Sequence, residues 1–424
     1  MQANFEHEAN SSYVLFHSSR LVYNIPMTDI IKIISVLAVI VLLLKRKWNL
    51  GVVMALSSVI LAVLYMLTPI DFLNACHTAA TDKTTINLIV ALTLIRIFES
   101  VMRKSGLMQE MMDSLRGMVI DRRILMASMP ALIGLLPSMG GAMFSAPMVE
   151  EASKGIKVSP EKKAFINYMF RHPWEFTLPL YPGVVLASAL TAYSLREIFL
   201  ANLPYALCLI IGGTVWGLKG IGVHREGFKN MSASGLLSFL PLALILVMVI
   251  VFHLNLSLSM GIIIIGLFIA QRYSYKNIFQ SLKEGLSWEI LLIILGVMTF
   301  KAILNSSGAV ANIGNFFTVH NIPVLPVLFF LPFIYGLLTG LTVGFVGGTF
   351  PILLGLENAN HIGAVSFAFA SGYVGVLLSP VHLCLVLTRE YFGAAMSGIY
   401  EKTMRVCVLI MLVALAEYFI LGRY

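Results

Sequence analysis

The chain carries a long series of apolar runs, and this feature limits its fold more than any other. A helix needs ~20 mostly apolar residues to cross a bilayer. Some runs approach this length without interruption, whereas two longer ones are broken by proline, glycine and polar residues. The uninterrupted runs are 28–44, 48–69, 85–102, 201–218, 235–252, 257–270, 287–304 and 403–422, and the broken ones are 164–193 and 365–388. About ten crossings predict an all-α polytopic membrane protein.

The composition supports this class. Charged residues make up 12% of the 424 residues and hydrophobic residues 58%, with a mean hydropathy of +0.88. An ordinary soluble domain has ~25% charged residues, so we expect the lipid bilayer to be the main partner of this chain. The net charge is +8, but the basic residues are spread over short loops. That pattern indicates membrane orientation and argues against nucleic-acid binding.

The first residues differ from the rest of the chain. Residues 1–26 are polar and have no basic segment next to an apolar core, so they do not resemble a signal peptide. Met27 stands directly before the first apolar run. We therefore expect residues 1–27 to be an N-terminal extension. It is either a disordered tail or a stretch that is not translated, with Met27 as the working start.

Two further apolar stretches, 124–149 and 324–353, contain Gly, Pro, Ser and Thr in their middle and are predicted to be re-entrant hairpins. With the N-terminus outside, 21 of the 29 Lys and Arg residues lie on the inner side and 5 on the outer side. This agrees with the excess of basic residues in cytoplasmic loops, and it requires that 124–149 does not cross. The pattern predicts a plasma-membrane protein with both termini outside and hairpins that open to opposite sides.

The two halves of the chain correspond to each other. At an offset of 202 residues, four positions of the first half fall on identical residues of the second half: Phe98 on Phe300, Ser105 on Ser307, Gly106 on Gly308 and Gly134 on Gly336. Each half has five crossings, and an odd number inverts the second half. We expect repeats at 28–220 and 235–424, joined by a cytoplasmic linker at 221–234. Inverted repeats with broken helices are typical of secondary transporters.

The centres of the two hairpins are candidate binding sites. A helix that begins after a Gly- or Pro-rich break presents free N–H groups to an anion, and the preceding free carbonyls suit Na⁺. The alternative is that these small residues allow close helix packing. The candidates are Pro137, Ser138, Gly140, Gly141 and Ser145 in the first hairpin, and Thr339, Gly340, Thr342, Gly344, Gly348 and Thr349 in the second.

The two broken helices carry the polar residues that are most costly to place in a membrane. The first contains Arg171, His172 and Glu175. Intramembrane charges face a cavity or a partner, so Arg171 is either a substrate clamp, with Glu175 as a coupling group, or the partner of Glu175 in a structural pair. Ser379, Pro380 and His382 lie in the second broken helix. They either bind a polar substrate or form a proline kink in which His382 bonds to neighbouring backbone.

Three stretches, GLLPSMGGAMFSAPMVEEA (134–152), RHPWEFTLPLYPGVVLAS (171–188) and SGYVGVLLSPVHLCLVLTREYFG (371–393), resemble an uncharacterised family of archaeal and bacterial integral membrane proteins. That family is placed in the ion transporter superfamily with divalent anion:sodium symporters and with citrate and gluconate permeases. The resemblance implies opposed hairpins, a homodimer and elevator-type motion. Sodium/dicarboxylate relatives carry Ser-Asn-Thr at their hairpin tips, where this chain has Ser138, Gly140 and Thr342 without an Asn.

These observations favour an ion-coupled secondary transporter that carries a small organic or inorganic anion with H⁺ or Na⁺. A cation or drug exporter is the alternative, and a membrane scaffold or an intramembrane enzyme fits less well. The chain lacks the sequence motifs of metalloproteases, serine hydrolases and ATP-binding proteins. The four cysteines, Cys76, Cys208, Cys384 and Cys407, show no metal-ligand spacing. We therefore expect no enzyme activity, no cofactor and no metal other than Na⁺ at the hairpin tips.

Overall fold

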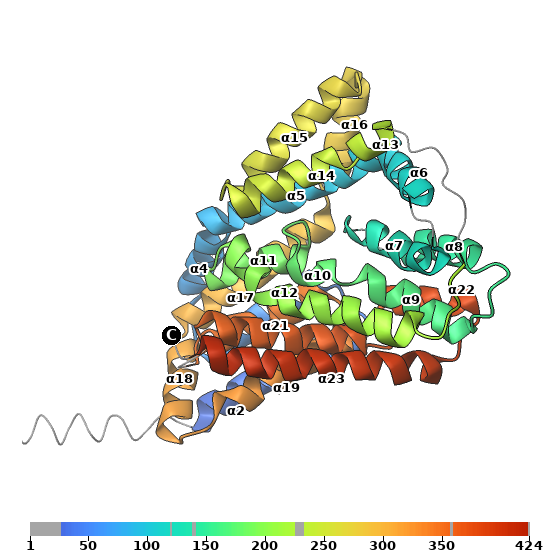
Figure 1. Ribbon diagram of the computed structural model, residues 1–424. Coiled ribbons are helices and arrows are strands. Elements are labelled where there is room, and N and C mark those ends of the chain that lie inside the picture. The colour runs from blue at the N-terminus through green and yellow to red at the C-terminus, as the bar shows by residue number, and fades with distance from the viewer. Residues whose placement is uncertain (1–26, 119–120, 138–140, 225–232, 357–358, 423–424) are drawn as a thin grey trace, which may run out of the picture.

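The computed structural model describes residues 27–118, 121–137, 141–224, 233–356 and 359–422, and this part of the chain is built of helices without a strand (Figure 1). Within it, 4 helices are long and apolar enough to cross a membrane: Lys83–Lys104, Leu195–Leu218, Tyr275–Ser306 and Met396–Leu421. Shorter apolar helices accompany them. The prediction of an all-α membrane protein is confirmed at this level, and the number of crossings stays a prediction.

The first half of the chain forms a continuous series of helices. They are α2 (Met27–Lys45), α3 (Leu50–Leu64), α4 (Pro69–Thr81), α5 (Lys83–Lys104), α6 (Leu107–Met118), α7 (Arg122–Gly134), α8 (Ala142–Ala152), α9 (Pro160–Arg171), α10 (Trp174–Thr177), α11 (Pro182–Thr191) and α12 (Leu195–Gly212), which continues as the π-helix η1 (Gly213–Leu218). The predicted extension lies outside the described residues, apart from Met27, which begins α2.

The described part of the second half is also a series of helices. Its helices are α13 (Ala233–Leu237), α14 (Leu240–Leu246) with the π-helix η2 (Val247–Val251), α15 (Leu256–Ala270), α16 (Tyr275–Gly285), α17 (Trp288–Ser306), α18 (Ala309–Val319), α19 (Val324–Thr339), α20 (Thr342–Leu353), α21 (Ile362–Leu377), α22 (Leu383–Phe392) and α23 (Met396–Leu421). Most of the predicted linker, residues 225–232, lies outside the described part.

The apolar runs of the sequence fall on helices, and the two broken runs are indeed interrupted. Residues 164–193 become α9, α10 and α11, and residues 365–388 become α21 and α22. Four helices lie outside the predicted segments, namely α4, α6, α16 and α18. They are short or rich in polar residues, as in α6 and α16, so a search for long apolar runs does not detect them.

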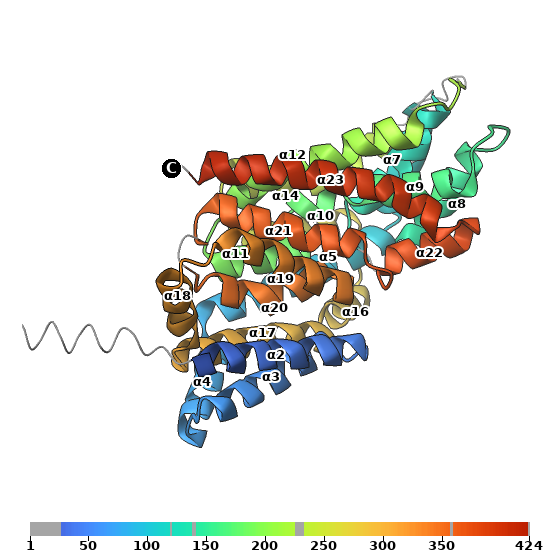
Figure 2. The ribbon, with the colours of Figure 1, turned by 90° about the horizontal axis from the view of Figure 1, so that it is seen from below.

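The helices pack in two groups. One group contains α2 to α5 together with α14 to α17, and the other contains α7 to α12 together with α19 to α23. Seen from below, α2, α3, α4 and α17 lie together along one side, while α12, α21 and α23 lie along the other (Figure 2). The groups contact each other where α11 meets α5, α20 meets α17 and α2 meets α19.

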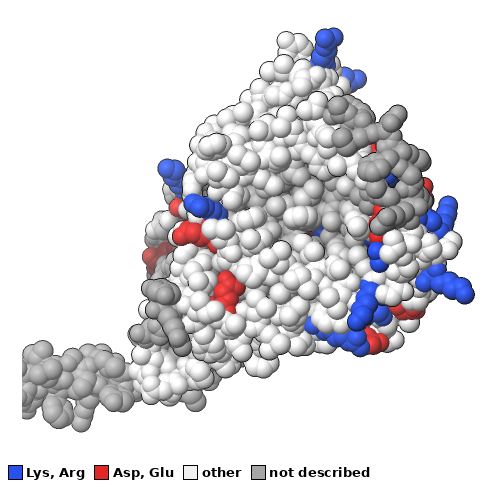
Figure 3. All heavy atoms as spheres, viewed as in Figure 1, with Lys and Arg blue, Asp and Glu red and all other residues white. Residues whose placement is uncertain are grey.

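Charged side chains are unevenly distributed over the face seen in Figure 3. Lys and Arg gather at the end formed by α8, α9 and α22 and at the tip around α15 and α16, and a smaller group of basic and acidic side chains lies at the opposite end of the molecule, on the left of the view. The broad area between the two ends of the molecule is almost free of charge on this face. An uncharged band between polar ends is what contact with lipid tails requires. The described part of the chain begins and ends at the same end of the molecule (Figure 1).

Both predicted hairpin segments fold as pairs of helices that pack on each other, α7 with α8 and α19 with α20. One glycine in each pair brings that pair close to the following broken helix. A Cβ atom on Gly134 would overlap the carbonyl of Arg171, and one on Gly336 would overlap the carbonyl of Gly372. Backbones in such contact leave no room for a side chain, which is how small residues hold membrane helices together.

We predict that Gly336→Ala destabilises the protein by about 1–3 kcal/mol, because the added methyl group must push α19 away from α21. Gly261→Ala on α15 is the control, since a Cβ there meets nothing within 4 Å. Thermal unfolding of the purified variants in detergent measures the difference. Equal melting temperatures for both variants would contradict the close packing of these backbones.

Candidate functional site

The two broken helices meet at their breaks, deep inside the second helix group. α9 ends at Arg171 and is followed by His172 and Pro173, whereas α22 begins at Leu383 directly after His382. The two histidines are 0% and 6% exposed. Their Nε2 atoms lie 3.0 Å apart although the residues are 210 positions apart in sequence. One polar side chain from each half of the chain therefore contributes to a single buried centre.

The end of α9 fixes the position of His172. Its backbone N–H donates to the carbonyl of Met169, three residues back, and not to Tyr168, four residues back. The carbonyl of Tyr168 is paired instead with the Nδ1 atom of His172, at 2.5 Å. Pro173 has no N–H to continue the helix. The ring of His172 thus completes the hydrogen bonds of the last helical turn.

His382 is held by the tip of the second hairpin. Its Nδ1 atom lies 2.7 Å from the carbonyl oxygen of Gly340. Gly340 has φ +63°, the left-handed region that favours glycine, and a Cβ there would lie 2.9 Å from backbone atoms of His382. Ser379 forms a second hydrogen bond between the break and the hairpin, because its hydroxyl donates to the carbonyl of Leu337 at 2.7 Å. The alternative in which His382 bonds to neighbouring backbone is therefore present in the structure.

Charged groups surround the two histidines. The side chain of Arg171 is among the largest fully buried ones, with 1% exposure. Its guanidinium group lies near Cys384, the second residue of α22. The Glu175 carboxylate, 9% exposed as a residue, lies 3.8 Å from the Nε2 atom of His172. In the structure Glu175 thus faces His172.

Cys384 is the residue of this centre that the sequence analysis did not select. The Nε2 or Nδ1 atoms of His172 and His382 and the Sγ atom of Cys384 all lie within 4.8 Å of one another, so the three could hold a metal ion. The spacing of possible ligands along the sequence could not reveal this group, because His172 lies far in sequence from His382 and Cys384. The available signal was the presence of one histidine beside the break of each broken helix.

A buried tyrosine from each broken helix hydrogen-bonds to the break of the other one. The hydroxyl of Tyr168 on α9 donates to the carbonyl of Leu377 at the end of α21, at 3.0 Å. The hydroxyl of Tyr373 on α21 donates to the carbonyl of His172 after α9, at 3.1 Å. Both tyrosines are fully buried. The breaks therefore satisfy each other's freed carbonyls across the two halves.

The predicted hairpin residues are placed differently. Ser145, Thr339 and Thr349 donate their hydroxyls to carbonyls of their own helices, and a Cβ on Gly344 or Gly348 would collide with neighbouring side chains of α19. These five take part in local packing, and Thr342 packs against Gly183 of α11. Pro137 follows α7, Gly141 caps α8, and Pro380 is exposed in the second break. Ser138 and Gly140 lie outside the described residues.

A comparison with protein families matches residues 29–421, nearly the whole chain, to the family described as "Protein of unknown function (DUF401)". The chain belongs to the DUF401 family. A comparison with curated proteins finds no significant match. The predicted membership of an uncharacterised family is thus confirmed, and the wider link to the ion transporter superfamily stays an inference.

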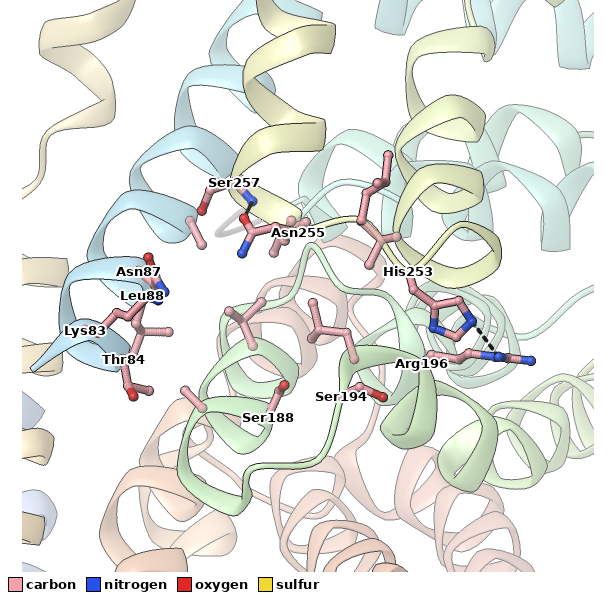
Figure 4. Close-up of a pocket in the computed structure, with 17 residues that line it drawn as sticks. Lys83, Thr84, Asn87, Leu88, Ser188, Ser194, Arg196, His253, Asn255 and Ser257 are labelled. Atoms are coloured by element: carbon pink, nitrogen blue, oxygen red, sulfur yellow. Dashed lines mark hydrogen bonds between the residues drawn. The ribbon is translucent and has the colours of Figure 1, made fainter.

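The DUF401 chain also has a pocket of about 420 Å³ at the seam between the two helix groups (Figure 4). Lys83, Thr84 and Asn87 of α5 line one side of it, and Ser188 and Arg196 line the other. The Nη1 atom of Arg196 lies 2.7 Å from the Nε2 atom of His253. None of the predicted site residues lines this pocket.

We predict that Tyr168→Phe lowers the stability of the protein by about 1–3 kcal/mol. The substitution removes the hydroxyl that donates a hydrogen bond to the buried carbonyl of Leu377. The matched control is Tyr275→Phe, since Tyr275 is 93% exposed. Thermal unfolding in detergent compares the two variants with the wild type. A melting temperature of Tyr168→Phe that equals the control would show that this hydrogen bond does not stabilise the break.

Proposed function

We propose that the protein is an ion-coupled secondary transporter that carries a small organic or inorganic anion together with Na⁺ or H⁺. The observation that carries the proposal is the buried centre formed by the two helix breaks. Arg171, fully buried, brings a permanent positive charge there, and two histidines lie beside it. An intramembrane cation of this kind is costly and marks a path for substrates or ions.

The order of the helices supports an inverted repeat, which the proposal includes. α6, α7 and α8 begin at Leu107, Arg122 and Ala142, and α18, α19 and α20 begin at Ala309, Val324 and Thr342, in the same order and at nearly constant separation. Gly134 and Gly336, which correspond at the offset of 202, both contact a carbonyl of the broken helix in their own half. Repeats with discontinuous helices at a shared site are the usual plan of secondary transporters.

The two helix groups support an elevator-type mechanism. In this proposal α2 to α5 and α14 to α17 form a fixed scaffold, and the second group carries the site across the membrane. The pocket at the seam would admit solute from the outer side, since Lys83 and Arg196 can attract an anion there. The proposal includes opposed hairpins, a homodimer and a plasma-membrane location with both termini outside.

We predict that a small anion raises the melting temperature of the purified protein, because a ligand that binds only the folded state stabilises it by mass action. The screen covers organic and inorganic anions, each with and without Na⁺ and at two pH values, to identify the coupling ion. Arg171→Gln should abolish the shift. Arg171→Lys keeps the positive charge but loses the planar guanidinium group, which can form two parallel hydrogen bonds to an anion. We therefore expect this variant to bind the anion roughly tenfold more weakly, a loss of ~1.4 kcal/mol.

The control for these variants is Arg405→Gln, since Arg405 pairs with Glu401 on the surface of α23. It should respond to the anion as the wild type does. A wild type that responds to no anion but is stabilised by cations or amphiphiles would overturn the proposal and favour an exporter. An anion shift that survives in Arg171→Gln would place the anion elsewhere, with the pocket at the seam as the next candidate.

A further inference from the structure

The hydrogen bonds of the two buried histidines determine where their protons are. The Nδ1 atom of His172 faces the carbonyl of Tyr168, and that of His382 faces the carbonyl of Gly340. A carbonyl oxygen can only accept a hydrogen bond, so each Nδ1 atom carries a proton. In the neutral tautomer, each Nε2 atom is then a bare acceptor.

Two bare acceptors facing each other at 3.0 Å repel, so this contact requires either a proton shared between the rings or a metal cation. Further electron donors lie around the pair. The thiol of Cys384 is within 4.8 Å of both rings, and a carboxylate oxygen of Glu175 is 3.8 Å from the Nε2 atom of His172. Metal-bound histidines usually donate their second ring N–H to a backbone carbonyl, which fixes the ring and exposes the other nitrogen. Both histidines have this arrangement.

We propose that the Nε2 atoms of His172 and His382 and the Sγ atom of Cys384 bind a zinc ion. Two imidazoles and one thiolate are a donor set that zinc prefers, and zinc takes nitrogen ligands at ~2.0–2.1 Å and sulfur at ~2.3 Å. Two nitrogens of a tetrahedral zinc site lie about 3.3 Å apart, close to the 3.0 Å between the Nε2 atoms. The ion would join the end of α9 to the start of α22.

The charges nearby are compatible with this ion. With zinc bound, the thiolate of Cys384 and the carboxylate of Glu175 bring two negative charges near the ion, and Arg171 beside Cys384 brings one positive charge. The two negative charges offset the charge of the bound zinc. Three protein ligands leave one coordination position for water or a solute. The zinc site does not depend on the proposed function, since an ion that only joins the two breaks would use the same ligands.

The experiment uses the full chain, purified in detergent through a tag that does not bind metals. The protein is treated with a chelator, loaded with zinc and dialysed, and its zinc content is measured by mass spectrometry. We expect the wild type to retain about one zinc ion per chain more than Cys384→Ser or His382→Gln. Cys208→Ser is the matched control, because Cys208 is also buried but lies on α12, outside this group.

Cobalt replaces zinc in a second measurement. A thiolate-to-cobalt absorption band is expected in the wild type and in Cys208→Ser, and it should be absent from Cys384→Ser. Should the variants fail to fold, X-ray absorption at the zinc edge of the wild type alone must show one sulfur and two imidazole ligands. Well-folded wild type that retains no zinc, a cobalt band that survives in Cys384→Ser, or a zinc spectrum without sulfur would each overturn the site.

These outcomes are separate from those of the anion screen. Loss of zinc binding with an intact anion-dependent shift would refute the metal site and leave transport standing. Zinc binding without a response to any anion would support the metal site and refute anion transport. Arg171→Lys keeps all three zinc ligands, so it should retain zinc while its response to anions weakens.

Discussion

The fold depends on the need to satisfy backbone groups where a helix breaks inside the protein. Water is scarce at that depth, and each freed carbonyl needs a donor from the protein. At the end of α9 the ring of His172 and the hydroxyl of Tyr373 are these donors, and at the end of α21 the hydroxyl of Tyr168 is one. The side chains that complete one break come in part from the other half of the chain, so neither break is complete alone.

This arrangement explains why polar residues gather at one place in a largely apolar molecule. Pro173 and Pro380 interrupt their helices, and the side chains that hydrogen-bond to the freed backbone groups are polar. Two of these side chains are histidines, and each uses one ring nitrogen for a backbone carbonyl. The second ring nitrogen is then free for chemistry. The residues that complete the helix breaks are thus the same ones that would form the proposed site, so the two readings of His382 are compatible.

The sequence was sufficient to predict the helical class, the positions of the apolar helices and both breaks, since length and hydropathy determine them. It also singled out Arg171, His172, Glu175 and His382, because charged residues and histidines are rare within apolar runs. It could not predict that His172 would meet His382, which is a property of three-dimensional packing.

Cys384 escaped selection for the same reason, since a buried cysteine is ordinary in a membrane helix. The polar residues of the hairpins stay predicted site residues. Ser145 and Thr349 stand in Gly-rich segments typical of ion sites, yet their hydroxyls donate to their own helices. A hydroxyl that donates to its own helix keeps its oxygen lone pairs for an ion, so these hydrogen bonds do not decide between helix packing and ion binding.

Gly340 shows how the hairpin and the buried centre are connected. Its left-handed backbone ends α19 and directs its carbonyl to His382, and its lack of a side chain lets the two segments touch. A ligand that displaces the ring of His382 must also move this carbonyl or break the hydrogen bond to it. Under the proposed function, binding at the centre and the position of the hairpin tip would therefore be coupled. In a transporter, this contact is where the occupancy of the site would be converted into movement of the hairpin.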